Sequence, residues 1–364
     1  MFKVLGIIAA AASLFLTGCT TTYTGRGIEP PPREWSLDMA TNPPTATPKP
    51  VPPPAALVRS TPPPAQISRP APILTWTSLT RWAGEHKLAA PRKIANQPVA
   101  TYAVNSTNGA MTLVIGSREA LWNGIEIHLG FAPELIDDQI FVHGLDLQKN
   151  LEPLLLANAL TFGTNRVLVI DPGHGGQNVG TKNLTNGRFE KEFTLDWALR
   201  IQSLLATNGW TVFLTRTNDI DVALSNRVAF AEAHHANAFI SLHFNSAAPS
   251  TIQDGMEIYC LTPTGMPSTL TRNYNDNWTD HYPNNEFDEG NLELAVRLQA
   301  SLLRATGEED RGVRRARFMG VLQGQKCPAV LIEGGFLSNP VEARKIESPE
   351  FQQKLAEGVA NALR

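Results

Sequence analysis

The stretch VLVIDPGHGG, residues 167–176, joins an apolar run to a polar, glycine-rich end. Residues 167–170 are apolar and lead directly into Asp171 and Pro172, after which His174 stands between glycines. A short apolar run bounded by turn residues is typical of a strand buried in a parallel sheet. In such sheets functional groups gather at the carboxyl ends of the strands. The stretch therefore predicts an α/β domain with His174 at its functional edge, on a backbone that the glycines allow to turn sharply.

The sequence that follows alternates between apolar runs and segments of helical periodicity. Further strands are predicted at 211–214, 238–242, 256–261 and 329–332. Helices are predicted where apolar side chains recur every fourth residue, at Phe193, Trp197, Ile201 and Leu205 and at Leu294, Leu298 and Leu302. Helix starts are predicted at Ser225, Asn339 and Ser348. This alternation indicates an α/β domain with a largely parallel sheet, which we place at residues 161–364.

The first residues, MFKVLGIIAAAASLFLTGCT, predict export and lipidation. Lys3 precedes an apolar run, as in an ordinary secretory signal peptide. A cysteine placed where that run ends favours a bacterial lipoprotein signal over residues 1–19, because LTGC resembles a lipobox and Cys19 would be acylated. Thr20 is not the aspartate that resembles an inner-membrane retention signal. We therefore expect a lipid-anchored protein of the cell envelope and periplasm, held by Cys19 to the outer rather than the inner membrane.

Residues 20–71 contain most of the chain's 27 prolines and cannot form a packed core. Proline favours extended polyproline II, so we expect a disordered but semi-rigid tether. A proline-rich recognition segment for a partner domain is the alternative. A lipid at one end of a long spacer implies a target held away from the membrane.

Residues 72–160 predict a small α+β domain. Asn123-Gly124 lies between two alternating runs, a strong hairpin signal. QIFVHGLDL, residues 139–147, predicts a further strand, and residues 150–160 a short helix. This segment resembles the small domain named after the copper amine oxidase N-terminus, without a recognisable metal site. We expect His128 and His143 to be ordinary half-buried histidines.

Charge and cysteine content narrow the function classes. The formal net charge is −3, which argues against a nucleic-acid partner held by backbone electrostatics. Apart from Cys19 the chain has only Cys260 and Cys327, and their spacing fits no metal site. A disulfide between them is left open, because each stands beside an apparent strand where small buried cysteines are common.

Polar residues follow three of the predicted strands. His174 follows the first, His243 the third and Glu333 the last, while Glu190 and Glu192 begin the helix after the first strand. Each has a structural explanation by itself, since glutamate suits the first turn of a helix. Together, two imidazoles and two carboxylates, Glu333 and one of the two glutamates at the helix start, are predicted at one sheet edge. A catalytic zinc ion commonly takes two His and one Glu and leaves a position for water, and a further carboxylate shuttles protons.

Six segments in order resemble the type-3 family of zinc-dependent N-acetylmuramoyl-L-alanine amidases. They are VLVIDPGHGG, FEKEFTLDWALRIQSLLATNGWTVFLTR, LSNRVAFAEAHHANAFISLHFNS, DGMEIYCL, RGVRRARFMGVL and PAVLIEGGFLSNPVEA. The resemblance covers residues 167–364 and implies a mixed, mostly parallel six-stranded sheet flanked by helices. It also implies peptidoglycan as the partner and substrate, cleaved at the amide between N-acetylmuramic acid and the L-alanine of the stem peptide.

Carried over by position, the resemblance implies three ligands for one zinc ion, His174, Glu190 and His243, and Glu333 as the catalytic carboxylate. Glu190 is chosen over Glu192 because the family's pair is Glu followed by Lys, as in Glu190-Lys191. Asn245 also falls on a family motif and is expected to contact substrate or to position its loop.

Residues 262–290 depart from the family pattern, being polar and asparagine-rich without helical periodicity. Some relatives carry a helix near here that blocks the zinc until a partner removes it. We therefore expect no strong self-inhibition, and the sequence identifies no activating envelope protein. A mobile lid or substrate-binding loop and a passive surface loop are equally compatible with this composition.

Two other functions fit part of the pattern. A zinc peptidase or another amidohydrolase would use the same water activation on a different bond. A non-catalytic wall-binding lipoprotein would be expected to have lost one of the four site residues, yet all four are present.

Overall fold

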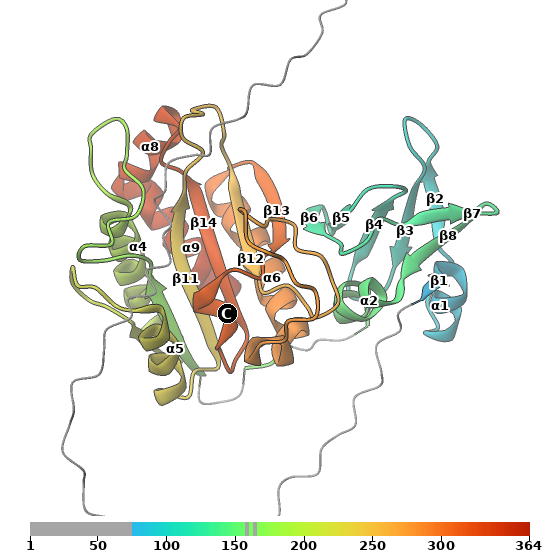
Figure 1. Cartoon of the computed structure of the whole chain (residues 1–364), viewed down its shortest axis with the longest axis horizontal. Helices are drawn as coiled ribbons and strands as arrows, with labels where there is room; N and C mark the ends of the chain where they lie inside the picture. The colour runs from blue at the N-terminus through green and yellow to red at the C-terminus, as the bar shows by residue number, and fades with distance from the viewer. Residues whose placement is uncertain (1–74, 157–159, 163–165) are drawn as a thin grey trace, which may run out of the picture. The chain divides into compact units, whose positions relative to one another are not determined.

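The computed structural model describes residues 75–156, 160–162 and 166–364 (Figure 1). Cys19 and the predicted tether, residues 20–71, lie outside the described residues. Across the described part of the chain, every helix is too short or too polar to cross a lipid bilayer.

The central sheet has the strand order β10-β9-β11-β14-β12-β13-β6-β5-β4-β3-β2. Its first six strands are β9 (Arg166–Pro172), β10 (Trp210–Leu214), β11 (Ala238–Asn245), β12 (Met256–Cys260), β13 (Asp310–Arg315) and β14 (Ala329–Phe336). Neighbours among these six are parallel except for β12 and β14. The predicted mixed α/β fold with a central sheet flanked by helices is confirmed. Pairing is mostly parallel among these six strands, but the sheet continues beyond the six that the resemblance implies, through antiparallel strands.

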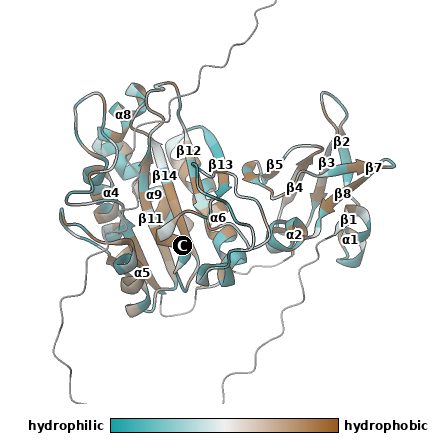
Figure 2. Ribbon diagram, viewed as in Figure 1, coloured by the Kyte–Doolittle hydropathy of each residue, from teal (hydrophilic) through white to brown (hydrophobic). Residues whose placement is uncertain are grey.

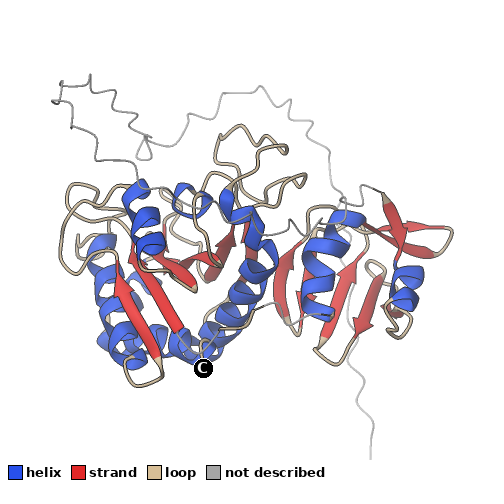
Figure 3. Cartoon of the chain, turned by 90° about the horizontal axis from the view of Figure 1, so that it is seen from below, coloured by secondary structure: helices blue, strands red, loops and turns tan. Residues whose placement is uncertain are grey.

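Helices cover both faces of this part of the sheet (Figure 3). They are α4 (Glu190–Leu205), α5 (Leu224–Ala233), α6 (Asp288–Thr306), α7 (Gly320–Gln323), α8 (Pro340–Glu347) and α9 (Pro349–Ala362). α4, α6 and α9 pack with the strands into one apolar core, and α5 and α7 into a second core on the opposite face. The predicted starts of α8 and α9 are confirmed, because Asn339 and Ser348 cap them with their side chains.

Successive side chains of each strand point to opposite faces of the sheet, and this determines which residues face the second core. Leu168, Ile170, Ile240, Leu242 and Ile332 belong to the first core. Val169, Phe239 and Leu331 belong to the second. Side chains on a strand alternate between faces, so Asp171, His243 and Glu333 lie on the side of the second core. Figure 2 shows that β11 and β14 are largely hydrophobic along their length.

Residues 75–156 contain eight strands and three α-helices. The strands are β1 (Trp76–Ser78), β2 (Arg92–Ala95), β3 (Thr101–Asn105), β4 (Ala110–Val114), β5 (Glu119–Trp122), β6 (Ile125–His128), β7 (Glu134–Ile136) and β8 (Gln139–His143). The helices are α1 (Leu79–Glu85), α2 (Gly144–Asp146), the π-helix η1 (Leu147–Leu151) and α3 (Glu152–Leu155). β1, β8 and β7 form a separate three-stranded sheet.

The predicted hairpin at Asn123-Gly124 is confirmed and joins β5 to β6. The run before it was predicted as one strand, which is wrong, because a turn at residues 115–118 divides it into β4 and β5. β6 also pairs in parallel with β13, where Ile127 lies opposite Val313. Strands from the two predicted domains therefore share one sheet.

Cys260 and Cys327 are both buried and free, so the structure contains no disulfide between them. The prediction that residues 262–290 lack helical structure is confirmed for 262–282 and wrong for 283–290, which are helical. A short 3-10 helix, η2 (Pro283–Phe287), then leads into α6.

Candidate active site

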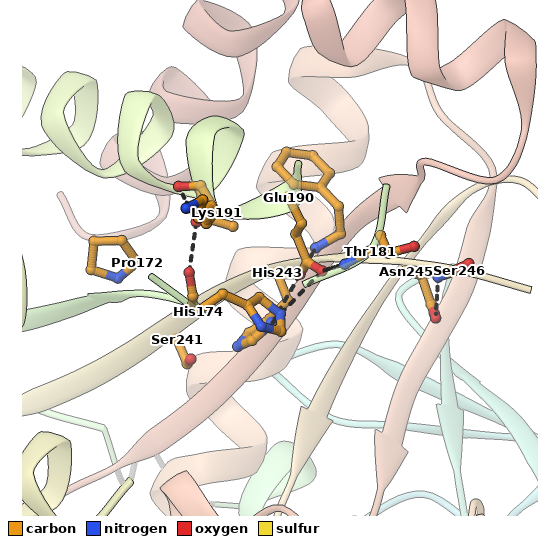
Figure 4. A network of polar contacts seen from close by, with 12 residues as sticks. Pro172, His174, Thr181, Glu190, Lys191, Ser241, His243, Asn245 and Ser246 are labelled. Atoms are coloured by element: carbon orange, nitrogen blue, oxygen red, sulfur yellow. Dashed lines mark hydrogen bonds and ion pairs between the residues drawn. The ribbon is translucent and has the colours of Figure 1, made fainter. Parts of the chain in front are cut away.

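His174, Glu190 and His243 come together from three separate segments (Figure 4). His174 Nε2 lies 3.0 Å from Glu190 Oε2. His243 Nδ1 lies 3.1 Å from Glu190 Oε1 and 3.1 Å from His174 Nε2. Two imidazole nitrogens and the two oxygens of one carboxylate therefore converge on one point. The structure brings together the three residues that the sequence predicts as a metal site.

The spacing of these atoms suits a small tetrahedral ion. Zinc bonds to His nitrogen and carboxylate oxygen at about 2.0–2.1 Å, which places neighbouring ligand atoms roughly 3.3 Å apart. The observed separations of 3.0 and 3.1 Å lie within a few tenths of an ångström of that value. Two imidazoles and one carboxylate are also the donor set that catalytic zinc prefers, and they leave a fourth position open.

His174 is held by an unusual backbone conformation. Its φ angle is 63°, in the left-handed region that few non-glycine residues adopt, and Gly175 and Gly176 also have positive φ. A Cβ atom at Gly173 would lie 2.4 Å from His243 Cε1. The predicted sharp turn is therefore present, and the glycine before His174 lets the two imidazoles approach. Strain of this kind clusters at functional sites.

Backbone amides and Asn178 orient the cluster. Thr181 N and Phe244 N each donate a hydrogen bond of 2.9 Å to the Glu190 carboxylate. His174 Nδ1 lies 2.8 Å from Asn178 Oδ1, so a proton on Nδ1 leaves Nε2 directed at Glu190 and His243. Asn178 was not singled out in the sequence, since an asparagine in a glycine-rich loop has an ordinary turn role.

Electrostatics keep Glu190 ionised. Burial opposes its charge, but His174 and the hydrogen bonds from both histidines lower the pKa of Glu190 below its ordinary range. Burial likewise opposes protonation of His174, yet the charge and hydrogen bond of Glu190 raise the pKa of His174. Burial lowers the pKa of His243. An ionised carboxylate and a neutral imidazole are the states that bind metal ions.

Glu192, the near neighbour of Glu190, does not enter the cluster. Its Oε1 accepts a hydrogen bond of 3.0 Å from Phe189 N, which caps the start of α4. Its Oε2 pairs with Arg188 Nε at 2.9 Å, and both of these side chains are partly exposed. The structure therefore gives Glu190 and Glu192 different surroundings, one at the cluster and one at the helix end.

Glu333 lies on β14 directly opposite His243 on β11. Its side chain is buried, and none of the described residues hydrogen-bonds to its Oε2. Burial, and then the negative charge of Glu190, raise the pKa of the Glu333 carboxyl well above its ordinary value. A buried carboxyl with one oxygen outside any described hydrogen bond is costly, so its place beside the cluster is suited to proton transfer.

A second layer of buried charge supports the strand ends. Asp171 forms an ion pair with Arg227 Nη1 and accepts hydrogen bonds from Thr215 and Ser241. Burial opposes the charge on Asp171, but Arg227 and these hydrogen bonds lower its pKa. Arg227 Nη2 also donates to His174 O at 2.8 Å, so the ion pair fixes the backbone that carries His174.

Arg216 supports the same turn from β10. Its guanidinium donates to the carbonyl oxygens of Pro172, Gly173 and Lys191 at 2.8–2.9 Å. No local sequence pattern indicates the roles of Arg216 and Arg227, because each is more than forty positions from its partners on β9.

Other predicted residues lie elsewhere. Asn245 is outside the cluster, and its Nδ2 donates to Glu257 Oε1 at 2.7 Å. His143 packs against Phe131 and accepts a hydrogen bond from Leu145 N, as an ordinary histidine does. His128 lies 3.5 Å from Glu126, and Glu119 is near enough for the three to hold a metal ion. Burial lowers the pKa of His128 to about 4, and the two carboxylates beside it lie partly in solvent.

Comparisons with known proteins agree on one family. Residues 168–364 match the family model described as N-acetylmuramoyl-L-alanine amidase. The chain is 32% identical over 198 residues to the N-acetylmuramoyl-L-alanine amidase CwlM of Bacillus licheniformis, which covers 54% of the chain and 66% of that relative. It is 33% identical over 192 residues to the N-acetylmuramoyl-L-alanine amidase LytC of Bacillus subtilis, which covers 53% and 34%. The chain thus spans no more than about two thirds of the length of these relatives.

Among solved structures, the chain is similar to the catalytic domain of CwlV, an N-acetylmuramoyl-L-alanine amidase from Bacillus (Paenibacillus) polymyxa var. colistinus. The sequences are 31% identical, and the match covers 54% of this chain and 96% of that one, with a TM-score of 0.45.

Proposed function

The chain belongs to the N-acetylmuramoyl-L-alanine amidase family through residues 168–364, and from this premise we propose that it is a zinc-dependent hydrolase of peptidoglycan. Its reaction is cleavage of the amide that joins the lactyl group of N-acetylmuramic acid to the L-alanine of the stem peptide. One observation carries the proposal: two imidazole nitrogens lie about 3 Å from each other and from the oxygens of one carboxylate, beside a buried carboxyl whose Oε2 has no hydrogen-bond partner among the described residues.

In this proposal His174, Glu190 and His243 hold the ion. A zinc ion bound there would polarise the scissile carbonyl and lower the pKa of water. Glu190 supplies the negative charge that a divalent cation requires, and the amides of Thr181 and Phe244 keep its two oxygens in place. Asn178 fixes the tautomer of His174.

Glu333 carries the proton. Amide nitrogen is a poor leaving group unless it is protonated, so a carboxyl must accept a proton from the attacking water and pass it to the alanine nitrogen. Glu333 Oε2 is suited to this because no described residue occupies its lone pairs. The position of Glu333 opposite His243 keeps the proton donor within one strand spacing of the ligands.

We further propose that the protein acts from the membrane. Acylation of Cys19 would anchor it in the cell envelope, and the proline-rich residues 20–71 would let the catalytic part reach the wall. The apolar signal that ends in LTGC and the density of proline after it support this arrangement. The outer membrane is favoured over the inner, because Thr20 follows the cysteine.

Digestion of purified peptidoglycan by the full chain tests the activity. We expect mass spectrometry to detect intact stem peptides with a new amino terminus at L-alanine. Products with amino termini elsewhere in the peptide would instead identify a peptidase that acts on another bond. Binding without release of any product would favour a wall-binding protein, and the Glu333→Gln variant provides the matched negative control.

A further inference from the structure

A pocket of about 390 Å³ lies on the same face of the sheet as Glu333. The polar residues of its wall include Asn245, Glu257, Tyr259, Arg272, Arg311 and Arg314. Glu257 on β12 stands directly opposite Glu333 on β14. Opposed residues of neighbouring strands lie about 5 Å apart, so the pocket begins beside the carboxyl assigned above to proton transfer. The ligand cluster and the pocket are therefore neighbouring parts of one surface.

The wall of this pocket is cationic. It contains three guanidinium groups and a single carboxyl group, that of Glu257. The whole chain has a formal net charge of −3, so this concentration of positive charge is local. A cationic pocket on an otherwise acidic chain indicates an anionic ligand.

Glu257 organises two of the arginines rather than filling the pocket. Its Oε2 lies 2.9 Å from Arg314 Nε and 3.4 Å from Arg311 Nε. Its Oε1 accepts hydrogen bonds from Asn245 Nδ2 at 2.7 Å and from the Tyr259 hydroxyl at 2.8 Å. Both oxygens of the Glu257 carboxylate thus have partners within the protein, and the residue is buried. It holds the arginines in place while their combined charge exceeds its own.

Arg314 lines the pocket, and its described contacts leave its two terminal nitrogens available. Both contacts that the structure describes for its guanidinium, to Glu257 and to Arg311 O, are made by Nε. The two terminal nitrogens form the edge that pairs with carboxylates in a bidentate manner. The Arg314 side chain lines the pocket and is 23% exposed, so part of it is accessible to a ligand in solution.

Arg272 covers the pocket from the loop at residues 262–282. Its φ angle is 44° and that of Asn273 is 65°, so the backbone turns through the left-handed region at this point. The guanidinium lies over the Phe318 ring at 5.9 Å and places Nη2 3.5 Å from Asn245 Oδ1. A buried ion pair between Arg317 and Asp276 fixes the loop behind it. The loop is therefore built to present a cation at the pocket.

We propose that this pocket binds a free carboxylate of the stem peptide, on the leaving side of the cleaved amide, and so selects acidic over amidated peptides. The inference rests on the proposed amidase function and names a specificity of the same site. Arg272 and Arg314 would contact the carboxylate, with Glu257 and Asn245 as positioning residues. The carboxylate does not change during hydrolysis, so its contact strengthens binding and lowers KM more than it raises kcat.

Two synthetic substrates test the proposal with the full, zinc-loaded chain. Both are muramoyl peptides that differ only at the residue after L-alanine, which carries a free α-carboxylate in one and a carboxamide in the other. We expect kcat/KM to be about ten- to a hundredfold higher for the carboxylate, as for the loss of a charge-assisted hydrogen bond. The difference should appear mainly in KM.

Arg272→Gln and Arg314→Gln should each reduce this ratio by about tenfold or more. Arg344→Gln is the matched control, because Arg344 is an exposed arginine in the last turn of α8 and should keep the ratio of the unaltered protein. A thermal melt of each variant separates loss of fold from loss of selectivity, and Arg272 is exposed on a loop, so its substitution leaves the core intact.

The outcomes separate the two proposals. Equal turnover of both substrates by the unaltered protein, or an unchanged ratio in both arginine variants, would overturn the carboxylate pocket and leave the amidase function standing. Failure to cleave either substrate would overturn the amidase function, on which the inference rests.

Discussion

Gly180 lies against Glu190 so closely that only a hydrogen atom fits between them. A Cβ atom at Gly180 would lie 2.6 Å from Glu190 Oε2 and 2.7 Å from His174 Cδ2. The φ angle of Gly180 is 70°, which also disfavours any side chain. The loop after His174 thus packs its bare backbone against two residues of the cluster.

We predict that Gly180→Ala displaces Glu190 and His174 and weakens zinc binding by about tenfold or more. Gly187→Ala is the control, because Gly187 has a similar φ of 77° but only the flexible Lys182 side chain near its Cβ. Titration with a competing chelator measures both affinities. Equal losses in the two variants would assign the effect to backbone strain alone.

Glu190→Ala should remove zinc and activity together, whereas Glu192→Ala should keep the metal. Glu192 caps α4, so its loss should cost about 1 kcal/mol of the free energy of unfolding. Metal analysis and thermal melts on the same preparations measure the two effects. Zinc loss in Glu192→Ala, with zinc retained in Glu190→Ala, would show that Glu192 rather than Glu190 is the ligand.

Glu333→Gln should fold, retain about one zinc ion per chain and bind wall fragments, yet turn over roughly two to four orders of magnitude more slowly. The amide keeps the size of the carboxyl but cannot shuttle the proton. Zinc content and turnover are measured on the same sample of the variant and compared with those of the unaltered protein. Loss of the metal would make Glu333 a ligand, and near-normal turnover would remove it from the mechanism.

Arg227→Met should destabilise the protein by about 3–5 kcal/mol, because it leaves the Asp171 carboxylate buried without its cation. The folded pKa of Asp171 lies below its ordinary value, so its contribution to stability is present above that ordinary value and is lost as the pH falls through the folded pKa. Asp171→Asn should therefore unfold with less acid dependence at the lowest pH. Denaturant melts of this variant and of the unaltered chain between pH 2 and 7 measure how the free energy of unfolding depends on pH. If both proteins lose stability equally at low pH, a group other than Asp171 causes the loss.

The sequence predicts the buried strands well, because a strand that is buried on both faces appears in the sequence as a continuous run of apolar residues. β9, β11 and β14 were each predicted from such a run. β13 was not, because DRGVRR places charged side chains at most positions of a strand whose buried residues are Gly312, Val313 and Arg315. Its pairing with β6 depends on a partner nearly two hundred residues away, which no local pattern records.

The candidate site likewise contains residues that the sequence predicts and residues whose roles depend on long-range contacts. His174, Glu190, His243 and Glu333 stand at the ends of predicted elements, so their position in the sequence already indicates a shared sheet edge. Arg216, Arg227 and Gly180 act through contacts that form only in the folded chain. Their residue types are common in loops and helices, and the chemistry of their roles appears only when the cluster is assembled.

The pairing of β6 with β13 has a consequence for how the protein behaves at high concentration. A strand with an unpaired edge offers its amide and carbonyl groups to other chains and promotes aggregation. β6 occupies that edge of β13, and the sheet then continues through β5, β4 and β3 to β2, whose sequence RKIA begins with two positive charges. Lysine and arginine at the border of a sheet discourage further strand addition. Removing residues 75–165 would therefore leave all four site residues in the chain but uncover the side of β13, and the shortened protein should self-associate where the full chain remains dispersed.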